Sequence, residues 1–381
     1  MSLFPIMPDG IAAKMDGVFD GKVALLPSPT IQNHAANLSY DHDGKLECCW
    51  FGGSLEGKSD ISIYRSRFNG SEWEDTEQLS FDKHRSEQNP IIFRPNAQSS
   101  LLIHTAQPGG NQDECVVHMR SIEQAQASCH LPLPLGTFVR ATPIVRKRDH
   151  AWLLPLFHCT QKEGAKWTGR HDTASVAISQ DQGQTWKVVP VPDSVGCVHM
   201  TIVPKTENHY FAFFRRRQAD FIYRTESFDG GDNWSTPTPT SLPNNNSSIA
   251  AIRLSDGRLA ICCNPINKDM SDDRRTSLYD ELGEDERPDA DGGCDVIWGI
   301  PRAPLIVAVS EDDGDTFPIQ VIVANSDGRC LSNNSIDGEN HELSYPALAE
   351  NPEGGLDVAF TLHRRAIAHV RLSPSQIGVK K

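Results

Sequence analysis

Three copies of one eight-residue pattern, Ser-x-Asp-x-Gly-x-Thr/Asn-aromatic, restrict the fold of this chain more than any other feature. The copies occupy residues 179–186, 227–234 and 310–317, and each follows an apolar run. In such a turn Asp and Ser hydrogen-bond nearby backbone N–H groups, Gly supplies a positive φ, and the aromatic ring packs back on the sheet. The pattern therefore predicts three β-hairpins and an all-β fold.

A second, fainter repeat consists of six places where a polar or small residue leads into an apolar strand. Successive places are 55, 53, 57, 49 and 97 residues apart. Most are followed by a turn and a second apolar strand, and four strands at a period of about 50 residues are typical of a β-propeller blade. The equivalent residues are His34, Asn89, Thr142, His199, Ser248 and Tyr345.

Six units of this length fit the chain, so we predict a six-bladed β-propeller that forms a single domain over residues 1–381. The last unit, residues 345–372, has only three clear strands. An N-terminal strand near residues 17–26 is expected to supply the fourth, which closes the ring and leaves no sheet edge bare.

The negative charge of the chain is concentrated in one segment. The net charge is −14, and residues 268–295 contain 11 Asp or Glu against 4 Lys or Arg. This segment has no periodicity, so we predict an acidic loop insertion at residues 265–300. The excess of acidic residues excludes nucleic acid as a partner, because no row of basic side chains is present to contact phosphates.

The sequence does not indicate a membrane protein or a secreted one. No apolar run approaches the roughly 20 residues that span a bilayer, and residues 1–9 lack the basic and apolar regions of a signal peptide. The ten cysteines include no C-x-x-C pair, and the doublets at 48–49 and 262–263 fall in expected strands, where neighbours point to opposite faces. We expect reduced core thiols and a cytoplasmic location.

Motifs for other kinds of site are missing from the sequence. It contains no H-E-x-x-H or H-x-H pattern, no phosphate-binding glycine loop and no nucleophile elbow. We therefore predict neither a metal nor a cofactor. The oligomeric state is not indicated.

The chain resembles the sialidase-like BNR family of β-propellers, whose repeated turn motif is the Asp box. The resemblance covers roughly residues 17–372. It implies the propeller fold and the cleavage of a glycan, either by an exo-sialidase or by a related lyase that acts on uronic-acid glycans. Besides the three turn motifs, the resembling stretches are 33–35, 50–57, 153–158, 242–249, 256–259, 344–347 and 363–365.

Two features depart from the family pattern. A typical sialidase opens with a Phe/Tyr-Arg-Ile-Pro segment whose Arg binds the substrate carboxylate, and nothing before His34 matches it. Its nucleophile is a Tyr directly before a Ser in the last blade, a place that Leu343 takes here. Tyr345 lies two positions further, and strand alternation predicts that it shares a face with Leu343.

In such propellers the ligand pocket lies at one mouth of the central channel. It is built from the starts of the innermost strands and from the loops that join second and third strands. We predict catalytic roles for His34, Glu56, Asp60, His158, His199 and Tyr345. We predict substrate binding by Trp50, Asn89, His104, Arg140, Arg215, Arg217, Asn245 and Arg364, with Trp50 either a sugar-stacking platform or a core residue.

The predicted mouth is rich in guanidinium and imidazole groups, although the whole chain is acidic. The planar guanidinium group of Arg donates two parallel hydrogen bonds to a carboxylate. Imidazoles exchange protons near neutral pH. The combination predicts an acidic oligosaccharide as the substrate.

Three functions fit this mouth. The leading one is a sialidase-like exo-glycosidase, which needs three Arg, a Tyr nucleophile with a Glu neighbour and an Asp acid/base. A lyase instead needs a cation for the uronate carboxylate and a base, such as His or Tyr, for the C5 proton. A non-catalytic glycan-binding propeller would use the same mouth only to capture its ligand.

Overall fold

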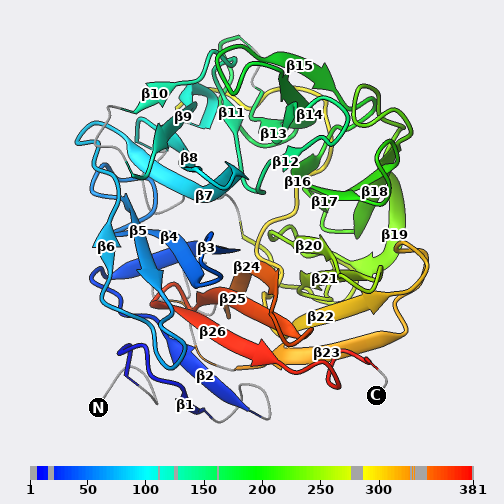
Figure 1. Ribbon diagram of the computed structural model, residues 1–381. Helices are drawn as coiled ribbons and strands as arrows, with labels where there is room; N and C mark the ends of the chain where they lie inside the picture. The colour runs from blue at the N-terminus through cyan, green and yellow to red at the C-terminus, as the bar shows by residue number, and fades with distance from the viewer. Residues whose placement is uncertain are drawn as a thin grey trace.

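Six antiparallel sheets surround a central axis in the computed structural model, as Figure 1 shows. The structure describes residues 7–15, 21–109, 112–123, 128–160, 163–275, 286–326, 328, 330 and 341–379. Each sheet is one blade, and its innermost strand lines the axis. The prediction of an all-β, six-bladed propeller is confirmed.

The first three blades come from the N-terminal half of the chain. Blade 1 contains β3 (Gln32–Tyr40), β4 (Leu46–Gly53), β5 (Ser62–Arg67) and β6 (Glu77–Gln78). Blade 2 contains β7 (Ser86–Asn96), β8 (Ser99–Gln107), β9 (Val116–Ser121) and β10 (Cys129–His130), with a short 3₁₀ turn, η1 (Gln112–Glu114), before β9. Blade 3 contains β11 (Thr137–Phe138), β12 (Ile144–Val145), β13 (Trp152–His158), β14 (Thr173–Ser179) and β15 (Lys187–Pro190).

The other three blades complete the ring. Blade 4 contains β16 (Cys197–Pro204), β17 (Tyr210–Arg216), β18 (Phe221–Ser227) and β19 (Thr238–Pro243). Blade 5 contains β20 (Ala250–Arg253), β21 (Leu259–Cys263), β22 (Leu305–Ser310) and β23 (Ile319–Ala324). Blade 6 contains β24 (Leu343–Glu350), β25 (Leu356–Leu362) and β26 (Ala366–Leu372), followed by the N-terminal β2 (Lys22–Leu25) and β1 (Ala13–Lys14).

The N-terminal strand closes the ring, as predicted. β2 pairs with β26 through Val23–Val370 and Leu25–Ala368. The two strands lie side by side in Figure 1, although they come from opposite ends of the chain. Leu25 is fully buried in a core cluster that also contains side chains of blades 5 and 6. The pairing therefore covers the outer edge of β26 and adds apolar contact between blades.

The three repeated motifs form turns between the third and fourth strands of blades 3, 4 and 5. In the first, Gly183 N–H donates to Ser179 Oγ at 2.7 Å and Thr185 N–H donates to Asp181 Oδ1 at 2.8 Å. The other two copies repeat both bonds. Gly183 has a φ of 88°, which a side chain would strain. All partners lie within four residues, which explains why the sequence alone predicts these turns.

Four innermost strands share an irregularity at the mouth of the channel. β3, β7, β16 and β24 each contain a register shift. At the shifts Ala35, Asn89, His199 and Tyr345 have φ between 50° and 60°. A β-bulge with a left-handed residue changes the direction of the side chains around it. The bulges therefore decide which side chains enter the channel.

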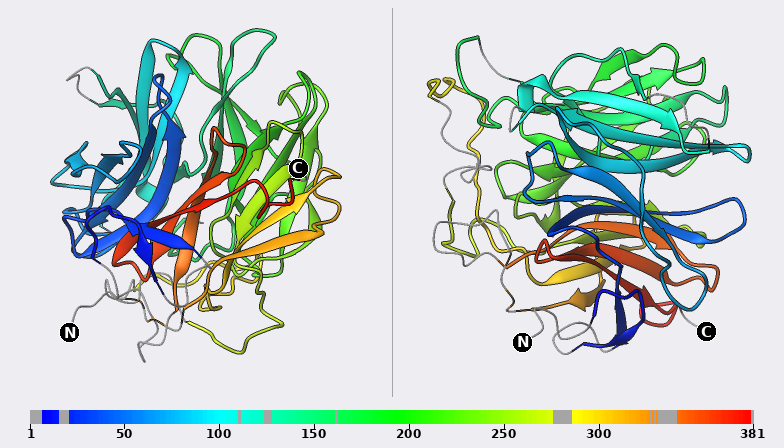
Figure 2. Two further views of the ribbon diagram at one scale, coloured as in Figure 1. Left: turned by 60° about the horizontal axis from the view of Figure 1, so that its bottom comes forward. Right: turned by 90° about the vertical axis from the view of Figure 1, so that its left-hand side faces the viewer.

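The connection between β21 and β22 contains the predicted acidic insertion, and residues 276–285 of it lie outside the described part of the chain. Figure 2 shows the described segment standing out from one face of the disc. It is attached to blades 3 and 4, because Lys166 N–H donates to Pro288 O and Ile297 N–H donates to Arg217 O. Its identity as an insertion stays a prediction.

All ten cysteines are free thiols, and eight of them are buried. The described residues contain no helix that is both long enough and apolar enough to cross a membrane. Neither observation tests the expected location of the protein.

Substitution of Leu25 tests the ring closure. Leu25→Ala should lower the free energy of unfolding by about 2–5 kcal/mol, because it leaves a cavity beside β26. Ile31→Ala is the matched control, since Ile31 is 64% exposed, and it should change stability by no more than about 0.5 kcal/mol. Urea unfolding measures both, and equal effects would contradict the structural role of β2.

Candidate functional site

Tyr345 lies at the centre of the candidate site. Strand alternation predicts that it shares a face with Leu343, and this prediction is wrong. Leu343 packs in the core cluster of blades 5 and 6, whereas Tyr345 packs against the inner ends of blades 1 and 2. The cause is the bulge in β24, where Tyr345 has a φ of 51°. The bulge thus turns the phenol into the channel.

Three guanidinium groups surround the phenol of Tyr345. Arg215 Nη1 lies 2.9 Å from the phenol oxygen. The guanidinium carbons of Arg140, Arg215 and Arg302 lie 5.5, 5.9 and 5.8 Å from the ring centroid. Burial raises the pKa of Tyr345, but the charges of Arg215 and Arg302 outweigh it and hold the pKa below its ordinary value. The phenolate form is therefore favoured relative to an ordinary tyrosine.

Arg140 and Arg215 are buried, and neither forms an ion pair with a described carboxylate. Burial lowers the pKa of each guanidinium to about 10. Arg215 Nε donates to Asn246 Oδ1 at 2.8 Å, while its Nη2 is buried without a hydrogen-bond partner. A buried cation with an unpaired donor is costly unless an anion binds to it. An anion beside the Nη2 of Arg215 would offset this cost.

Glu342 connects Arg302 with a further arginine, Arg364. It accepts hydrogen bonds from Arg302 Nη1 at 2.7 Å and from Arg364 Nε at 3.1 Å. Ser344 Oγ also donates to it, at 2.6 Å. Burial raises the pKa of Glu342, but Arg302 and Arg364 hold it well below its ordinary value. Arg364 additionally pairs with Glu56, so one guanidinium group bridges the two carboxylates.

Two histidines flank the phenol, and both are neutral at pH 7. The rings of His34 and His199 lie 4.1 and 5.5 Å from the ring of Tyr345, between centroids. Burial and then the charge of Arg364 lower the pKa of His34 well below its ordinary value. Burial and then Arg215 do the same to the pKa of His199. His34 Nε2 and His199 Nδ1 are buried without partners, so each ring offers an unused nitrogen.

The structure brings together seven of the sequence-predicted residues through direct contacts. They are His34, Glu56, Arg140, His199, Arg215, Tyr345 and Arg364.

Arg217 lies next to this cluster and is already paired. Its Nε and Nη2 donate to Asp172 Oδ2 at 2.9 and 2.6 Å. Its guanidinium also lies 5.1 Å from the ring centroid of Trp298, which belongs to the β21–β22 connection. Arg217 therefore holds that connection against blade 4, and its role in substrate binding stays a prediction.

The remaining predicted histidines bond within their own blades. His104 Nε2 lies 3.0 Å from Glu87 Oε1. The two ring nitrogens of His158 lie 3.1 Å from the Thr137 hydroxyl and 2.6 Å from the Ser175 hydroxyl. Neither ring contacts Tyr345, and both residues lie on the second strand of their blade rather than on the innermost one.

Trp50 and Asp60 also lie outside the contacts of Tyr345. Trp50 is fully buried in the core of blade 1, and its indole N–H donates to Asn33 Oδ1. It is the core residue of the two alternatives, since a fully buried ring cannot stack on a sugar. Asp60 Oδ2 accepts the N–H of Ser54 at 3.0 Å, in the loop between β4 and β5.

The two predicted amides form hydrogen bonds away from Tyr345. Asn89 donates to the Thr105 hydroxyl at 3.4 Å, and Asn245 donates to the carbonyl of Pro301 at 2.8 Å. The neighbouring Asn246, which the sequence does not single out, contacts Arg215 instead.

Sequence reasoning also missed Glu342 and Arg302. Glu342 lies three residues before Tyr345, and this spacing is the signal that could have identified it. Arg302 is the second residue after the segment assigned to the acidic insertion, so no strand pattern places it at the mouth. Residue types alone do not reveal that the two form an ion pair.

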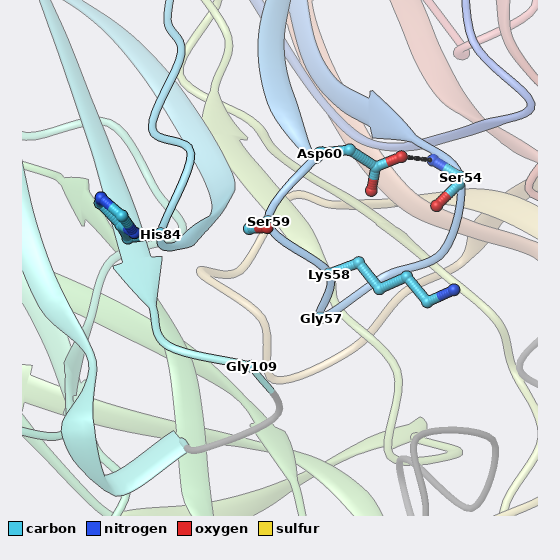
Figure 3. A pocket seen from close by; sticks show the side chains of 7 residues that line it. All are labelled: Ser54, Gly57, Lys58, Ser59, Asp60, His84 and Gly109. Carbon is cyan, nitrogen blue, oxygen red and sulfur yellow. Dashed lines mark hydrogen bonds between the residues drawn. The ribbon is translucent and has the colours of Figure 1, made fainter.

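A pocket of about 530 Å³ lies between blades 1 and 2. Figure 3 shows Lys58 and Asp60 on the β4–β5 loop, with His84 and Gly109 across from them. Among the described residues, no group of three or more His, Cys, Asp or Glu is arranged to hold a metal ion.

The ring of six blades with one polar, arginine-rich mouth defines a sialidase-like propeller. Residues 44–358 match the family model for the BNR repeat-like domain, and the chain belongs to that family. A comparison with curated proteins gives no match.

Several solved structures share the fold at low sequence identity. The NanB sialidase from Streptococcus pneumoniae is 13% identical with a TM-score of 0.65, over 99% of this chain and 72% of that chain. The intramolecular trans-sialidase from Ruminococcus gnavus is 10% identical with a TM-score of 0.63, over 97% and 100%. A protein of unknown function from Dyadobacter fermentans is 14% identical with a TM-score of 0.67, over 94% and 100%. Likeness at this identity shows the fold alone.

Removal of the Glu342 charge tests the ion-pair network. Glu342→Gln should lower the free energy of unfolding by about 3–5 kcal/mol at pH 7, because it leaves Arg302 without its carboxylate. The folded-state pKa of Glu342 lies below its ordinary value of 4.5, so its contribution is complete above about pH 4.5 and is lost as the pH falls through the folded-state pKa.

Unfolding of both proteins between pH 7 and pH 3 measures this effect. The stability difference between wild type and Glu342→Gln should shrink below about pH 4.5. Glu353→Gln, at an exposed turn, is the control and should leave stability nearly unchanged at every pH. A difference that is constant with pH would contradict the proposed pairing.

Proposed function

We propose that this protein cleaves a terminal acidic sugar from an oligosaccharide, as a sialidase-like exo-glycosidase. The observation that carries the proposal is the pair of buried cations, Arg140 and Arg215, that flanks the Tyr345 phenol without a carboxylate partner. A substrate carboxylate would supply the missing anion, and the unpaired Nη2 of Arg215 would donate to it.

Tyr345 is the nucleophile in this proposal. Its lowered pKa increases the phenolate fraction, and a phenolate can attack the anomeric carbon and form a covalent glycosyl intermediate. The bond to the leaving oxygen breaks, this oxygen takes up a proton, and water then cleaves the intermediate. The fixed charges of Arg215 and Arg302 orient the phenol before the substrate arrives, which reduces reorganisation during the reaction.

Elimination is the second candidate, and a specific observation favours it. Glu342 and Glu56 are both paired with arginine, whereas His34 Nε2 and His199 Nδ1 lack partners. A neutral imidazole beside a carboxylate-binding arginine is suited to remove the C5 proton of a uronate. The leaving group would then depart without water, and an unsaturated sugar would result.

Product masses separate the two reactions. The protein is incubated with a panel of sialylated and uronate-terminated oligosaccharides, and the products are analysed by mass spectrometry. Hydrolysis gives products whose summed mass exceeds that of the substrate by one water, and elimination gives products that sum to the substrate mass. We expect hydrolysis; absence of cleavage across the panel would support a glycan-binding propeller.

Substitutions at the site provide a second test on any cleaved substrate. Arg215→Met should lower kcat/KM by about 10²–10³, because it removes a charge that faces the substrate carboxylate. Tyr345→Phe should abolish the hydrolytic intermediate. In an elimination that uses histidine as the base, Tyr345→Phe would retain substantial activity, which would overturn the nucleophile assignment.

Arg148→Met serves as the matched control for both substitutions. Arg148 lies in the turn after β12, where it pairs with Asp232 and does not contact Tyr345. The substitution Arg148→Met should leave kcat/KM unchanged, and circular dichroism should confirm that all three variants fold.

A further inference from the structure

The β21–β22 connection is anchored on a blade other than its own. Both of its ends join strands of blade 5, yet its described residues 286–302 bond to the loop between β13 and β14 of blade 3. Lys166 Nζ lies 3.1 Å from Asp289 Oδ1, and Cys294 N–H donates to Arg170 O at 2.8 Å. The connection is therefore held by blade 3 as well as by blade 5.

Two glycines of this connection lie against backbone atoms. A Cβ atom on Gly293 would lie 2.3 Å from Arg170 O, and one on Gly299 would lie 2.6 Å from Arg275 N. Both glycines also have a positive φ, of 78° and 93°. A side chain at either place would require a shift of the backbone. This close packing fixes the path of the connection and, with it, the position of Trp298.

The indole ring of Trp298 contacts two arginines at the end of β17. Its centroid lies 5.1 Å from the guanidinium carbon of Arg217 and 6.0 Å from that of Arg215. Arg217 is fixed by its ion pair with Asp172, and its guanidinium carbon also lies 5.5 Å from the ring centroid of Trp167. Arg217 therefore holds the indole ring next to Arg215.

The indole ring stabilises the charge of Arg215 in a way that a carboxylate could not. A carboxylate would accept N–H bonds of the guanidinium and cancel its charge, whereas an aromatic ring attracts the cation through its quadrupole. Arg215 donates from Nε to Asn246 and from Nη1 to Tyr345, and its Nη2 is without a partner. Trp298 therefore supports the buried cation and leaves Nη2 for a ligand.

We propose that Trp298 is a positioning residue for Arg215. Its indole ring holds the guanidinium against the phenol of Tyr345 and keeps Nη2 for the substrate carboxylate. The second part rests on the proposed function, because it requires an anionic substrate. Trp298 is not among the contacts of Tyr345 described above, so it acts on the phenol through Arg215.

Ultraviolet titration of the Tyr345 phenol tests the positioning without any substrate. The tyrosinate signal of Tyr345 is the difference between each protein and the same protein carrying Tyr345→Phe. Burial raises the pKa of Tyr345 and the charge of Arg215 lowers it, so a guanidinium that moves away should let the pKa rise. Trp298→Leu should therefore raise the pKa, whereas Trp298→Phe, which keeps an aromatic ring, should hold it near the wild-type value.

Trp186→Leu is the matched control for this titration. Trp186 lies in the turn after β14 and donates its indole N–H to Gly183 O, so its loss should leave the pKa of Tyr345 unchanged. Every variant keeps the other charged and titratable groups around the phenol, which are His34, Glu56, Arg140, His199, Arg302 and Arg364.

A second variant displaces the connection without removing the indole. Gly299→Ala should raise the pKa of Tyr345 as Trp298→Leu does, and it decides the matter if circular dichroism shows that Trp298→Leu does not fold. An unchanged pKa in the folded variants would overturn the positioning role.

A double-mutant cycle tests the same role on the best-cleaved oligosaccharide of the panel. Trp298→Leu should lower kcat/KM about tenfold in the wild-type background. It should have no further effect on a protein that already carries Arg215→Met, because Trp298 acts through Arg215. Losses that add in the double variant would contradict the proposal. If no oligosaccharide is cleaved, the proposed function fails, and the titration still decides the role of Trp298.

Discussion

Arg140 is the residue on which the centre of the propeller depends. From the segment between β11 and β12, its Nη2 donates to the carbonyls of Ala36, Tyr345 and Pro346 at 3.0, 3.2 and 3.1 Å. Its Nε donates to the Ser248 hydroxyl at 3.2 Å. One side chain of blade 3 thus binds the innermost segments of blades 1, 5 and 6. It fixes the backbone of Tyr345 and closes the inner end of the site with a positive charge, which a lysine could not do with the same planar geometry.

The other charges of the site are arranged around the buried positive charge of Arg140. Buried charges are costly, so Glu342, Glu56 and Asp172 each neutralise an arginine at the mouth. Arg140 and Arg215 remain without such partners. Burial and then their charges lower the pKa of His199, while the charges of Arg215 and Arg302 favour the phenolate of Tyr345. The mouth is therefore positive, although the protein as a whole is acidic. The propeller itself does not determine this chemistry, because the same fold carries different sites.

Part of the site could be predicted from the sequence, and part could not. The repeat spacing identified His34, His199 and Tyr345 correctly as residues at the starts of innermost strands. Strand alternation misplaced the Tyr345 side chain, since a bulge breaks the period of two. The rule on loops between second and third strands also placed His104 at the mouth, and Trp50 as one of two alternatives, although both are buried within their blades. Residues beside a long connection, such as Arg302, have no local pattern that indicates where they lie.

The sequence by itself determined the turns, the number of blades and the closure of the ring. The turns depend on hydrogen bonds within four residues, and the number of blades follows from the repeat along the chain. The closure follows from the strand that the last repeat lacks, although it joins β2 to β26 from opposite ends of the chain. Which charges meet depends on the three-dimensional fold. Arg364 reaches Glu56 across 308 positions, and Arg140 reaches Tyr345 across 205. Such contacts arise because ring closure brings the blade starts to one axis, and buried charges then select their partners by distance rather than by order in the chain.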